Sequence, residues 1–482
     1  MPAIDITAST TLQSLTGSKT YGQADGSFTF QRSIPAINGY DVVVAGGGPA
    51  GAAAAVCAGR LGAKVLLIES TGCLGGMGTS GLVTAFDPMA NGERCLVGGF
   101  MRELVETMYV RGYMMPDIDP DCWRKKFHCW SPFRAEGLKL MLDEFVLAAG
   151  VEVRYFTRVI DAEADPADRR VKGLVLSNVE GHTYVKAPVF IDATGDAMVA
   201  NICGVPCREA ARDTPHIMPA TMASLFAGID FSQKTWQMQQ DALKRALADG
   251  HFTQFDRHLP GMSRVGHQLG YLNGGHMFNL NALRCRDLSD GAMWGRKLAA
   301  EYMEFYRKYM PGCENMEHVT TASLLGIRES RRIVGEYELN IEDYLARREF
   351  PDQIAVFNKF VDIHPYDCSQ SEYDRFIAEK DKTARLNVGE YFGIPYSILV
   401  PQGWNNLWVA GRCASSDVMV HGSIRVQPAA SMMGQAAGTA AVQSLRTGQP
   451  AHSLNTRELV QTLREHNAYL PQKELSEKMT LK

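Results

Sequence analysis

The hydrophobic pattern is most regular between Tyr40 and Glu69. An apolar run at 41–45 is followed at once by glycines and then by an alanine-rich stretch, and a second apolar run at 64–68 ends on Glu69. Short apolar runs bounded by turn residues are typical of buried strands, and the stretch between them has the length of a helix. The pattern therefore predicts a strand, a glycine turn, a helix and a parallel second strand.

Two helices and a change of period come next. Apolar residues at helical spacing predict a helix over 100–111 and a second helix that begins at Ser131, with Pro132 just inside it, and ends at Gly150. From Val151 the period becomes two, which predicts a strand meander followed by a buried strand.

The second half of the chain contains two kinds of segment. Amphipathic helices are predicted at 232–248 and 289–309, whereas a strand at 407–410 and a small-residue helix from Pro428 to Leu445 have the composition of the first domain. We therefore expect an α/β fold in which a parallel sheet and a β-meander form one domain and mixed α+β structure forms another. The expected parts are an N-terminal arm (1–38, with an extended piece at 27–34), the first domain (39–206 and 401–450), the second domain (207–400) and a helical tail (451–482).

Composition narrows the class of protein. A chain of 482 residues is too long for one hydrophobic core, which agrees with two domains. With 45% hydrophobic residues, 21% charged residues and a net charge of -4, nothing points to nucleic acid or to a membrane surface. No apolar run approaches the roughly 18 residues of a spanning helix, and the polar start lacks a signal pattern. We expect a cytoplasmic protein with a small-molecule substrate, and the sequence leaves homo-oligomers open.

The cysteines predict neither disulfides nor metal sites. Eleven cysteines are scattered without a CxxC pair, and the closest groupings are Cys203 with Cys207 and Cys122 with Cys129. We therefore expect buried free thiols and no bound metal. Cys73 has no charged neighbour in the sequence to activate it, which argues against thiol-redox chemistry.

The glycine turn carries the first chemical signal. Gly46, Gly48 and Gly51 have GxGxxG spacing between the predicted strand and helix. In a Rossmann-like βαβ unit, these positions permit the tight turn, the approach of the backbone to a pyrophosphate and the close packing of the helix on the sheet. The helix N-terminus offers unpaired N–H groups to phosphates, and Glu69 is placed to bind a ribose diol. The sequence predicts a dinucleotide site.

Several motifs together resemble a known family. These are the 40–69 unit, GCLGGMGTSG (72–81), IDATGDA (191–197), GIRESRRIVGEYEL (326–339), DIHP (362–365), AGRCASS (410–416) and GSIRVQP (422–428). They resemble the FAD-dependent oxidoreductases of the glutathione-reductase type, over nearly all of the chain from Arg32 to Gly448. Many relatives place an acid after the late glycine, whereas this chain has Arg412 there, as a phosphate contact or as the partner of a buried carboxylate.

The resemblance implies that FAD is the cofactor of a Rossmann-like FAD-binding domain. The early glycines and Glu69 would hold the ADP half, Val159 would meet the adenine, and the C-terminal loop and helix would face the flavin. The residues implied for FAD are Gly46, Gly48, Pro49, Ala50, Gly51, Glu69, Ser70, Gly75, Gly76, Met77, Thr79, Val159, Ala193, Thr194, Gly195, Gly411, Arg412, Ser423, Arg425 and Val426.

Two groups of arginines are candidates for the chemistry. Arg425 lies in a predicted 423–427 loop at the positive end of the late helix, where a fixed cation would stabilise negative charge on the flavin. A structural salt bridge is the alternative for this residue. In the GIRESRR segment, either Arg328 or Arg331 reaches the substrate, or the charges are paired and tie the two domains together.

Three histidines are candidates for acid–base work. His364, His421 and His276 lie in polar segments, and imidazole titrates near neutral pH. Tyr396 is a further candidate behind them. For each histidine the alternative is a structural role.

Together these features predict an enzyme that moves a hydride from a small organic substrate, such as an alcohol, an amine or an activated C–H compound, to FAD. Only one dinucleotide fingerprint is present, so we expect reoxidation by oxygen or another acceptor rather than by a second nucleotide domain. The alternatives are an ene-reductase or a monooxygenase on the same frame, a non-catalytic FAD-binding subunit, and a thiol-redox enzyme that would use Cys73.

Overall fold

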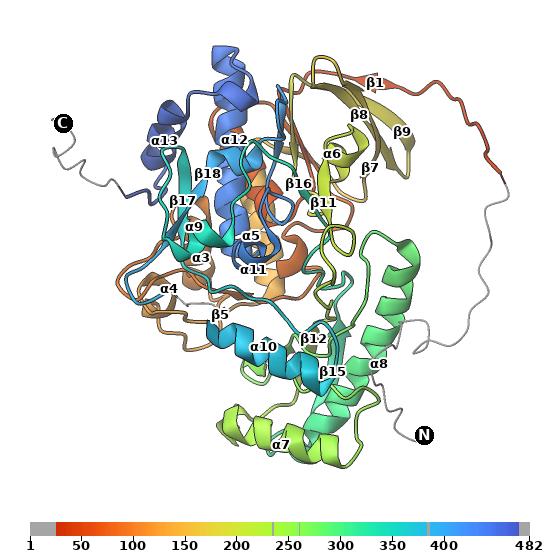
Figure 1. Ribbon diagram of the computed structural model, residues 1–482, viewed down its shortest axis with the longest axis vertical. Helices are drawn as coiled ribbons and strands as arrows, with labels where there is room; N and C mark the ends of the chain where they lie inside the picture. The colour runs from red at the N-terminus through yellow and green to blue at the C-terminus, as the bar shows by residue number, and fades with distance from the viewer. Residues whose placement is uncertain (1–25, 234–235, 260, 383–385, 472–482) are drawn as a thin grey trace.

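A parallel sheet forms the centre of the computed structural model, which describes residues 26–233, 236–259, 261–382 and 386–471 (Figure 1). Its strand order is β19-β10-β2-β3-β6, and every neighbouring pair is parallel. The strands are β2 (Val42–Ala45), β3 (Val65–Ile68), β6 (Glu152–Arg154), β10 (Val189–Asp192) and β19 (Leu407–Val409). Apart from the edge strand β6, they are buried along their whole length, as their continuous apolar runs require.

Each face of the sheet is covered by a different layer. Four helices pack on one face: α2 (Pro49–Arg60), α3 (Gly99–Val110), α5 (Ala135–Ala148) and α12 (Gln427–Thr447). The antiparallel meander packs on the other face, and β1 (Ala36–Ile37) joins it beside β9. The meander strands are β7 (Arg158–Asp165), β8 (Arg170–Asn178) and β9 (Gly181–Lys186). This arrangement confirms the predicted α/β class with a parallel sheet and a meander.

Mixed α+β structure lies beyond the end of the sheet. An antiparallel sheet of order β13-β14-β12-β15 packs with α7 (Trp236–Ala248) and α8 (Cys285–Tyr309), and these helices lie in the lower part of Figure 1. Its strands are β12 (Ser224–Ala227), β13 (Met262–Arg264), β14 (Gly270–Leu272) and β15 (Glu317–Thr321).

Shorter elements connect the two parts. Three antiparallel pairs are β4 (Ala85–Phe86) with β5 (Ser131–Pro132), β11 (Cys207–Glu209) with β16 (Arg331–Ile333), and β17 (Gln353–Phe357) with β18 (Phe392–Pro395). The remaining helices are α4 (Asp121–Arg124), α6 (Met198–Ile202), α9 (Ile341–Leu345), α10 (Gln370–Lys382), α11 (Val418–Ile424) and α13 (Thr456–Glu465). Among the described helices, none has both the length and the apolar character needed to cross a membrane.

Some predicted element boundaries were wrong. Ser131 and Pro132 form strand β5 instead of the start of a helix, and α5 begins only at Ala135. The N-terminal arm adds its strand at 36–37 and not at 27–34, and residues 1–25 lie outside the described part. Ser423 belongs to α11, so the predicted 423–427 loop shrinks to the short break between two helices. The tail helix is confirmed for 456–465, and 472–482 lie outside the described part.

The meander prediction was wrong in one respect. The first predicted strand divides in two: β6 joins the edge of the parallel sheet, and the meander starts with β7. Val159, which the resemblance places against the adenine, therefore lies at the beginning of a meander strand. Alternating apolar residues continue through both strands, so periodicity alone does not show that the chain changes sheets at this point.

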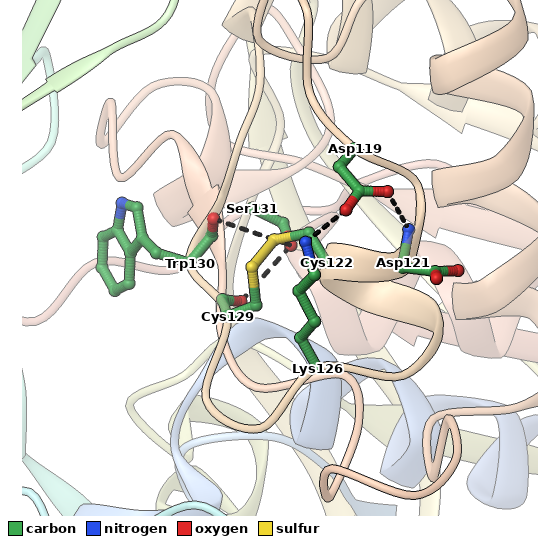
Figure 2. Close-up of a disulfide and its surroundings, with 7 residues drawn as sticks. All are labelled: Asp119, Asp121, Cys122, Lys126, Cys129, Trp130 and Ser131. Atoms are coloured by element: carbon green, nitrogen blue, oxygen red, sulfur yellow. Dashed lines mark hydrogen bonds and ion pairs between the residues drawn. A yellow bond between two sulfur atoms is a disulfide. The ribbon is translucent and has the colours of Figure 1, made fainter.

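A disulfide joins Cys122 and Cys129, which corrects the prediction that both are free thiols (Figure 2). Their Cα atoms lie 5.2 Å apart because the chain turns back on itself after α4. Six intervening residues are no recognised disulfide spacing, so only the turn brings the two thiols together. Trp130 follows at once, and its ring points away from the disulfide in Figure 2. Free thiols throughout the chain would favour a reducing compartment, and this disulfide weakens that argument. The cytoplasmic location stays a prediction.

Helices α2 and α12 pack with almost no space between their backbones. A Cβ on Gly434 would lie 2.0 Å from the Ala50 carbonyl oxygen, and a Cβ on Gly438 would lie 2.3 Å from that of Ala54. Such contacts are closer than any side chain tolerates, so only glycine permits this crossing.

We expect Gly438→Ala to lower the free energy of unfolding by about 1–3 kcal/mol, because the added methyl group forces the two helices apart. The measurement is denaturant unfolding followed by circular dichroism. Arg446→Ala, at the exposed end of the same helix, is the control and should leave the midpoint unchanged. Equal stability of Gly438→Ala and the wild type would contradict the close packing.

Candidate functional site

One cavity of about 970 Å³ runs from the carboxyl ends of the parallel strands to the mixed α+β structure beyond the sheet. Open α/β sheets bind ligands at this edge. Most of the residues predicted for FAD lie in its wall. These are Gly46, Gly48, Pro49, Ala50, Glu69, Ser70, Gly76, Met77, Val159, Ala193, Thr194, Gly195, Gly411, Arg412, Arg425 and Val426.

The early glycine turn forms a cradle without side chains. Gly46 has a φ of +95°, which lets the chain turn sharply out of β2. Gly48 is the N-cap of α2 and has no side-chain hydrogen bond to the helix end, so the first N–H groups face the cavity without a capping side chain. A Cβ on Gly48 would meet no protein atom within 4 Å. The turn therefore leaves room for a phosphate group where a side chain would otherwise lie.

Glu69 is held in place before any ligand binds. Its Oε2 accepts a 2.7 Å hydrogen bond from the Gly47 N–H, and its Oε1 accepts one of the same length from the Thr71 N–H. The side chain is buried at the end of β3 and borders the cavity. A carboxylate oxygen has more than one lone pair, so each can still accept a bond from a ribose hydroxyl.

Four predicted FAD residues lie behind the cavity wall. Gly51 packs α2 against the turn, since a Cβ there would lie 1.7 Å from the Gly46 carbonyl oxygen. The Gly75 N–H donates to the Gly47 carbonyl, and the buried Thr79 hydroxyl donates to the Leu74 carbonyl. Ser423 is buried and donates to the Lys359 carbonyl. None of the four lines the cavity in the described part of the chain.

Arg412 is the partner of a carboxylate. Its guanidinium lies 2.6 Å from Asp196 and donates to the carbonyl oxygens of Gly195 and Ile327. It therefore ties the end of β10 to the late strand and to the 326–332 segment. Of the two roles left open from the sequence, the pairing role is the one that the contacts support.

Arg425 borders the cavity next to the N-terminus of α12, on the side where the flavin is expected. Its Nη2 lies 3.1 Å from Asp362 Oδ2, so the structural salt bridge is present. Its buried Nε has no hydrogen-bond partner among the described residues. Together with the space at Gly48, this unused donor fits a bound FAD, because a flavin ring offers carbonyl and nitrogen acceptors. The residues present thus fit the expected cofactor.

The far end of the cavity is polar and contains Arg328. Its Nη1 donates to the Pro219 carbonyl at 2.5 Å, and the residue is 7% exposed. Burial and the nearby charge of Arg425 lower the pKa of Arg328 to about 9, so it is still a cation at neutral pH. No carboxylate lies within ion-pair distance of it in the described part of the chain.

Histidine rings form the rest of this end. His258 and His364 line the cavity, and His276 is buried directly behind them, with its Nε2 3.0 Å from His364 Nδ1. Burial and the charge of His276 lower the pKa of His258 to about 3. Burial and the Arg328 charge hold the pKa of His364 well below its usual value. Both cavity-lining rings are therefore neutral near pH 7.

Two carboxylates accompany these rings. Burial alone would raise the pKa of Asp256, but the adjacent His276 ring and the hydrogen bond from the His258 backbone N–H lower it to about 2. Asp362 shows the same balance: burial opposes its ionisation, whereas His364, Arg425 and Lys359 bring its pKa well below the usual value.

His421 lies outside the cavity wall. Its Nε2 lies 2.9 Å from the Arg328 carbonyl oxygen, and the ring is 1% exposed. Burial, followed by the charges of Arg332 and Arg425, holds the pKa of His421 well below its usual value. The contacts describe a neutral ring that fixes the backbone beneath Arg328.

Sequence reasoning missed several residues of the wall. His258, Asp362 and the buried ion pair of Lys359 with Asp87 all border the cavity. Gln427 at the start of α12 borders it as well. A repeated Asp-x-His pattern, at 256–258 and at 362–364, is the signal that could have revealed His258.

We expect Gly48→Val to fold normally but to lose bound FAD, because the added Cβ meets no protein atom within 4 Å and the side chain would fill the phosphate position. Flavin released per polypeptide is the measurement, with thermal unfolding of the flavin-free form as the check on folding. Gly51→Ala is the contrast: its methyl group strikes the Gly46 carbonyl, so both folding and binding should suffer. A yellow Gly48→Val protein with full flavin content would contradict this position of the pyrophosphate.

We expect acid to destabilise the fold through its buried neutral histidines. As the pH falls below the unfolded pKa of about 6.5, the unfolded chain takes up a proton at His421 and the folded chain does not, so stability falls by up to about 1.4 kcal/mol per pH unit for each such ring. His421→Gln keeps a donor for the Arg328 carbonyl and should reduce the slope between about pH 6 and 5 by one proton. The measurement is urea unfolding at several pH values. The control is His216→Gln at an exposed site, and an unchanged slope in His421→Gln would contradict the assignment.

Several solved structures are similar to this chain. One is a geranylgeranyl bacteriochlorophyll reductase-like protein from Thermoplasma acidophilum, with 11% identity, coverage of 90% of this chain and 83% of that chain, and a TM-score of 0.44. A second is the flavin-dependent brominase Bmp2, with 15% identity, coverage of 89% of this chain and 83% of that chain, and a TM-score of 0.44. A third is p-nitrophenol 4-monooxygenase PnpA from Pseudomonas putida DLL-E4, with 12% identity, coverage of 90% of this chain and 82% of that chain, and a TM-score of 0.43.

A curated relative matches over a short stretch. Dihydrolipoyl dehydrogenase from Trypanosoma brucei brucei is 53% identical over 47 residues, which is a tenth of each chain. By contrast, the family model described as FAD dependent oxidoreductase matches residues 41–463, which is most of the chain. The chain therefore belongs to the FAD dependent oxidoreductase family and is a FAD-dependent enzyme, as the motifs predicted.

Proposed function

We propose that this oxidoreductase oxidises a small organic anion by hydride transfer to FAD, with oxygen or another acceptor reoxidising the cofactor. The single observation that carries the proposal is the buried, unpaired guanidinium of Arg328 at the far end of the cofactor cavity. A buried cation costs free energy unless an anion lies beside it. A carboxylate of the substrate supplies that anion.

Four other cations of the cavity wall, buried or partly buried, already have carboxylate partners. Lys359 pairs with Asp87, and Arg331 pairs with Glu209 at 3.2 Å. The guanidinium groups of Arg412 and Arg425 pair with Asp196 and Asp362. Arg328 therefore carries the charge that an incoming ligand can neutralise, and its planar fork suits a carboxylate better than an ammonium group would.

Other groups of the chain orient the reaction. FAD supplies a two-electron acceptor at the strand ends. The N-terminus of α12 and Arg425 place positive charge where the flavin ring is expected, which favours the arrival of negative charge there. The neutral rings of His258 and His364 make this end of the cavity polar, so it receives the oxygen or nitrogen atom next to the carbon that is oxidised. The proton on that atom is lost to solvent as the hydride leaves for the flavin.

We expect 2-hydroxy acids, amino acids or related small acids to bleach the flavin absorbance of the anaerobic enzyme, and their neutral amides or alcohols to do so far less. In Arg328→Met, KM for the acid should rise roughly 10- to 100-fold, because a charged hydrogen bond contributes about 1.5–3 kcal/mol. Stopped-flow absorbance measures the bleaching of the flavin and its dependence on the concentration of the acid. Arg328→Lys should raise KM for the acid less than Arg328→Met does.

Flavin content of each variant shows that the cofactor site is intact. Arg208→Met, at an exposed ion pair with Glu338, is the matched control and should behave as the wild type. The proposal would be wrong if neutral analogues bleached the flavin as well as the acids did. It would also be wrong if only the pre-reduced enzyme reacted, with an alkene as the oxidant.

A further inference from the structure

Three imidazole rings converge at the far end of the cavity. His258, His276 and His364 each present a ring nitrogen, and these nitrogens all lie within 4.8 Å of one another. The residues come from separate segments of the chain, so the fold brings them together and local sequence does not. Such a convergence of nitrogen donors is the geometry of a metal site or of a hydrogen-bonded cluster.

Two carboxylates lie beside the rings. His276 Nδ1 lies 3.2 Å from Asp256 Oδ2, and His364 Nε2 lies 3.6 Å from Asp362 Oδ1. Neither contact is a hydrogen bond, and His276 Nδ1 has no hydrogen-bond partner among the described residues. Asp256 is itself held by the backbone N–H groups of His258 and His276, at 2.9 and 3.1 Å, so it is fixed beside the rings as a negative charge.

The two buried rings already meet nitrogen to nitrogen. His276 Nε2 and His364 Nδ1 lie 3.0 Å apart, so one of them donates a proton to the other when no ion is bound. A metal ion can replace this shared proton and accept a lone pair from each ring. The third nitrogen, from His258, favours the metal ion because a shared proton needs only two acceptors.

We propose that the protein binds a divalent first-row transition metal ion through His258, His276 and His364. The open coordination position faces the cofactor cavity, since His258 and His364 line it and His276 lies behind. Imidazole donors suit Zn²⁺ or Fe²⁺ rather than Mg²⁺ or Ca²⁺, which require oxygen ligands.

Asp256 and Asp362 act as positioning residues for this ion. Carboxylates behind ligating histidines fix the tautomer and raise the basicity of the ring. The buried rings of Phe278 and Phe376 pack against the histidines and limit access of water from that side. With the ion bound, the open position accepts an oxygen atom of the substrate; this last step rests on the proposed function, whereas the metal site does not.

The test measures metal in the FAD-loaded full-length protein. After dialysis against a chelator, the protein is incubated with Zn²⁺ or, as a spectroscopic probe, Co²⁺, and excess metal is removed. We expect about one ion per chain by plasma mass spectrometry, and Co²⁺ absorption bands at longer wavelengths than those of the flavin. His276→Ala and the milder His258→Gln should each weaken metal binding at least about 100-fold with flavin content retained. Asp256→Asn should weaken it about 10- to 100-fold.

His216→Ala, at the protein surface, is the control for loss of a histidine and should bind metal as the wild type does. Wild-type protein that retains FAD but takes up neither ion would overturn the proposal. The rings of His276 and His364 would then share only a proton. Equal metal binding by the wild type and by His276→Ala would overturn it too, because the ion would then lie elsewhere. A metal-loaded enzyme that oxidises no organic anion would instead contradict the proposed function and leave the metal site intact.

Discussion

The contact between α2 and α12 is the constraint on which the rest of the site depends. The two helices come from opposite ends of the chain, and small residues on both allow their backbones to touch at Gly434 and Gly438. Because the helices begin at the same edge of the sheet, this contact brings the N-terminus of each to one cavity. The cradle at Gly48 and the positive end of α12 therefore face a single cavity, and neither segment could form it alone.

Charge is distributed in this cavity in a consistent way. Four cations in its wall, Lys359 buried and three arginines partly buried, lie next to carboxylates of the protein, so they add structure without adding much net charge. Arg328 differs because its guanidinium donates to a backbone carbonyl and forms no ion pair with a carboxylate in the described part of the chain. An enzyme that must hold a substrate against the cofactor has a use for one unpaired charge, since a fully neutralised wall would bind acids and neutral compounds alike.

The cofactor end of the site was predictable from the sequence, and the substrate end was not. The positions of Gly46, Gly48 and Glu69 at the turn and at the end of β3 depend on neighbours a few residues away, so local order was enough to place them in the cavity wall. The partners of Arg412, Arg425 and Arg328 depend on segments that the fold brings together from far along the chain. Side-chain type alone could not distinguish a paired arginine from an unpaired one, just as the spacing of the two cysteines did not reveal their disulfide.

The repeated Asp-x-His pattern shows how such a site can still leave a trace in the sequence. In 362–364 the carboxylate faces the histidine of its own segment, whereas in 256–258 it faces His276 from another segment. The second arrangement is the more informative one, because Asp256 also accepts the backbone N–H groups of both segments and so fixes their distance. A carboxylate used only for charge balance would not need these bonds. Their presence indicates that the positions of the three rings matter, as they must where ring nitrogens meet at one point.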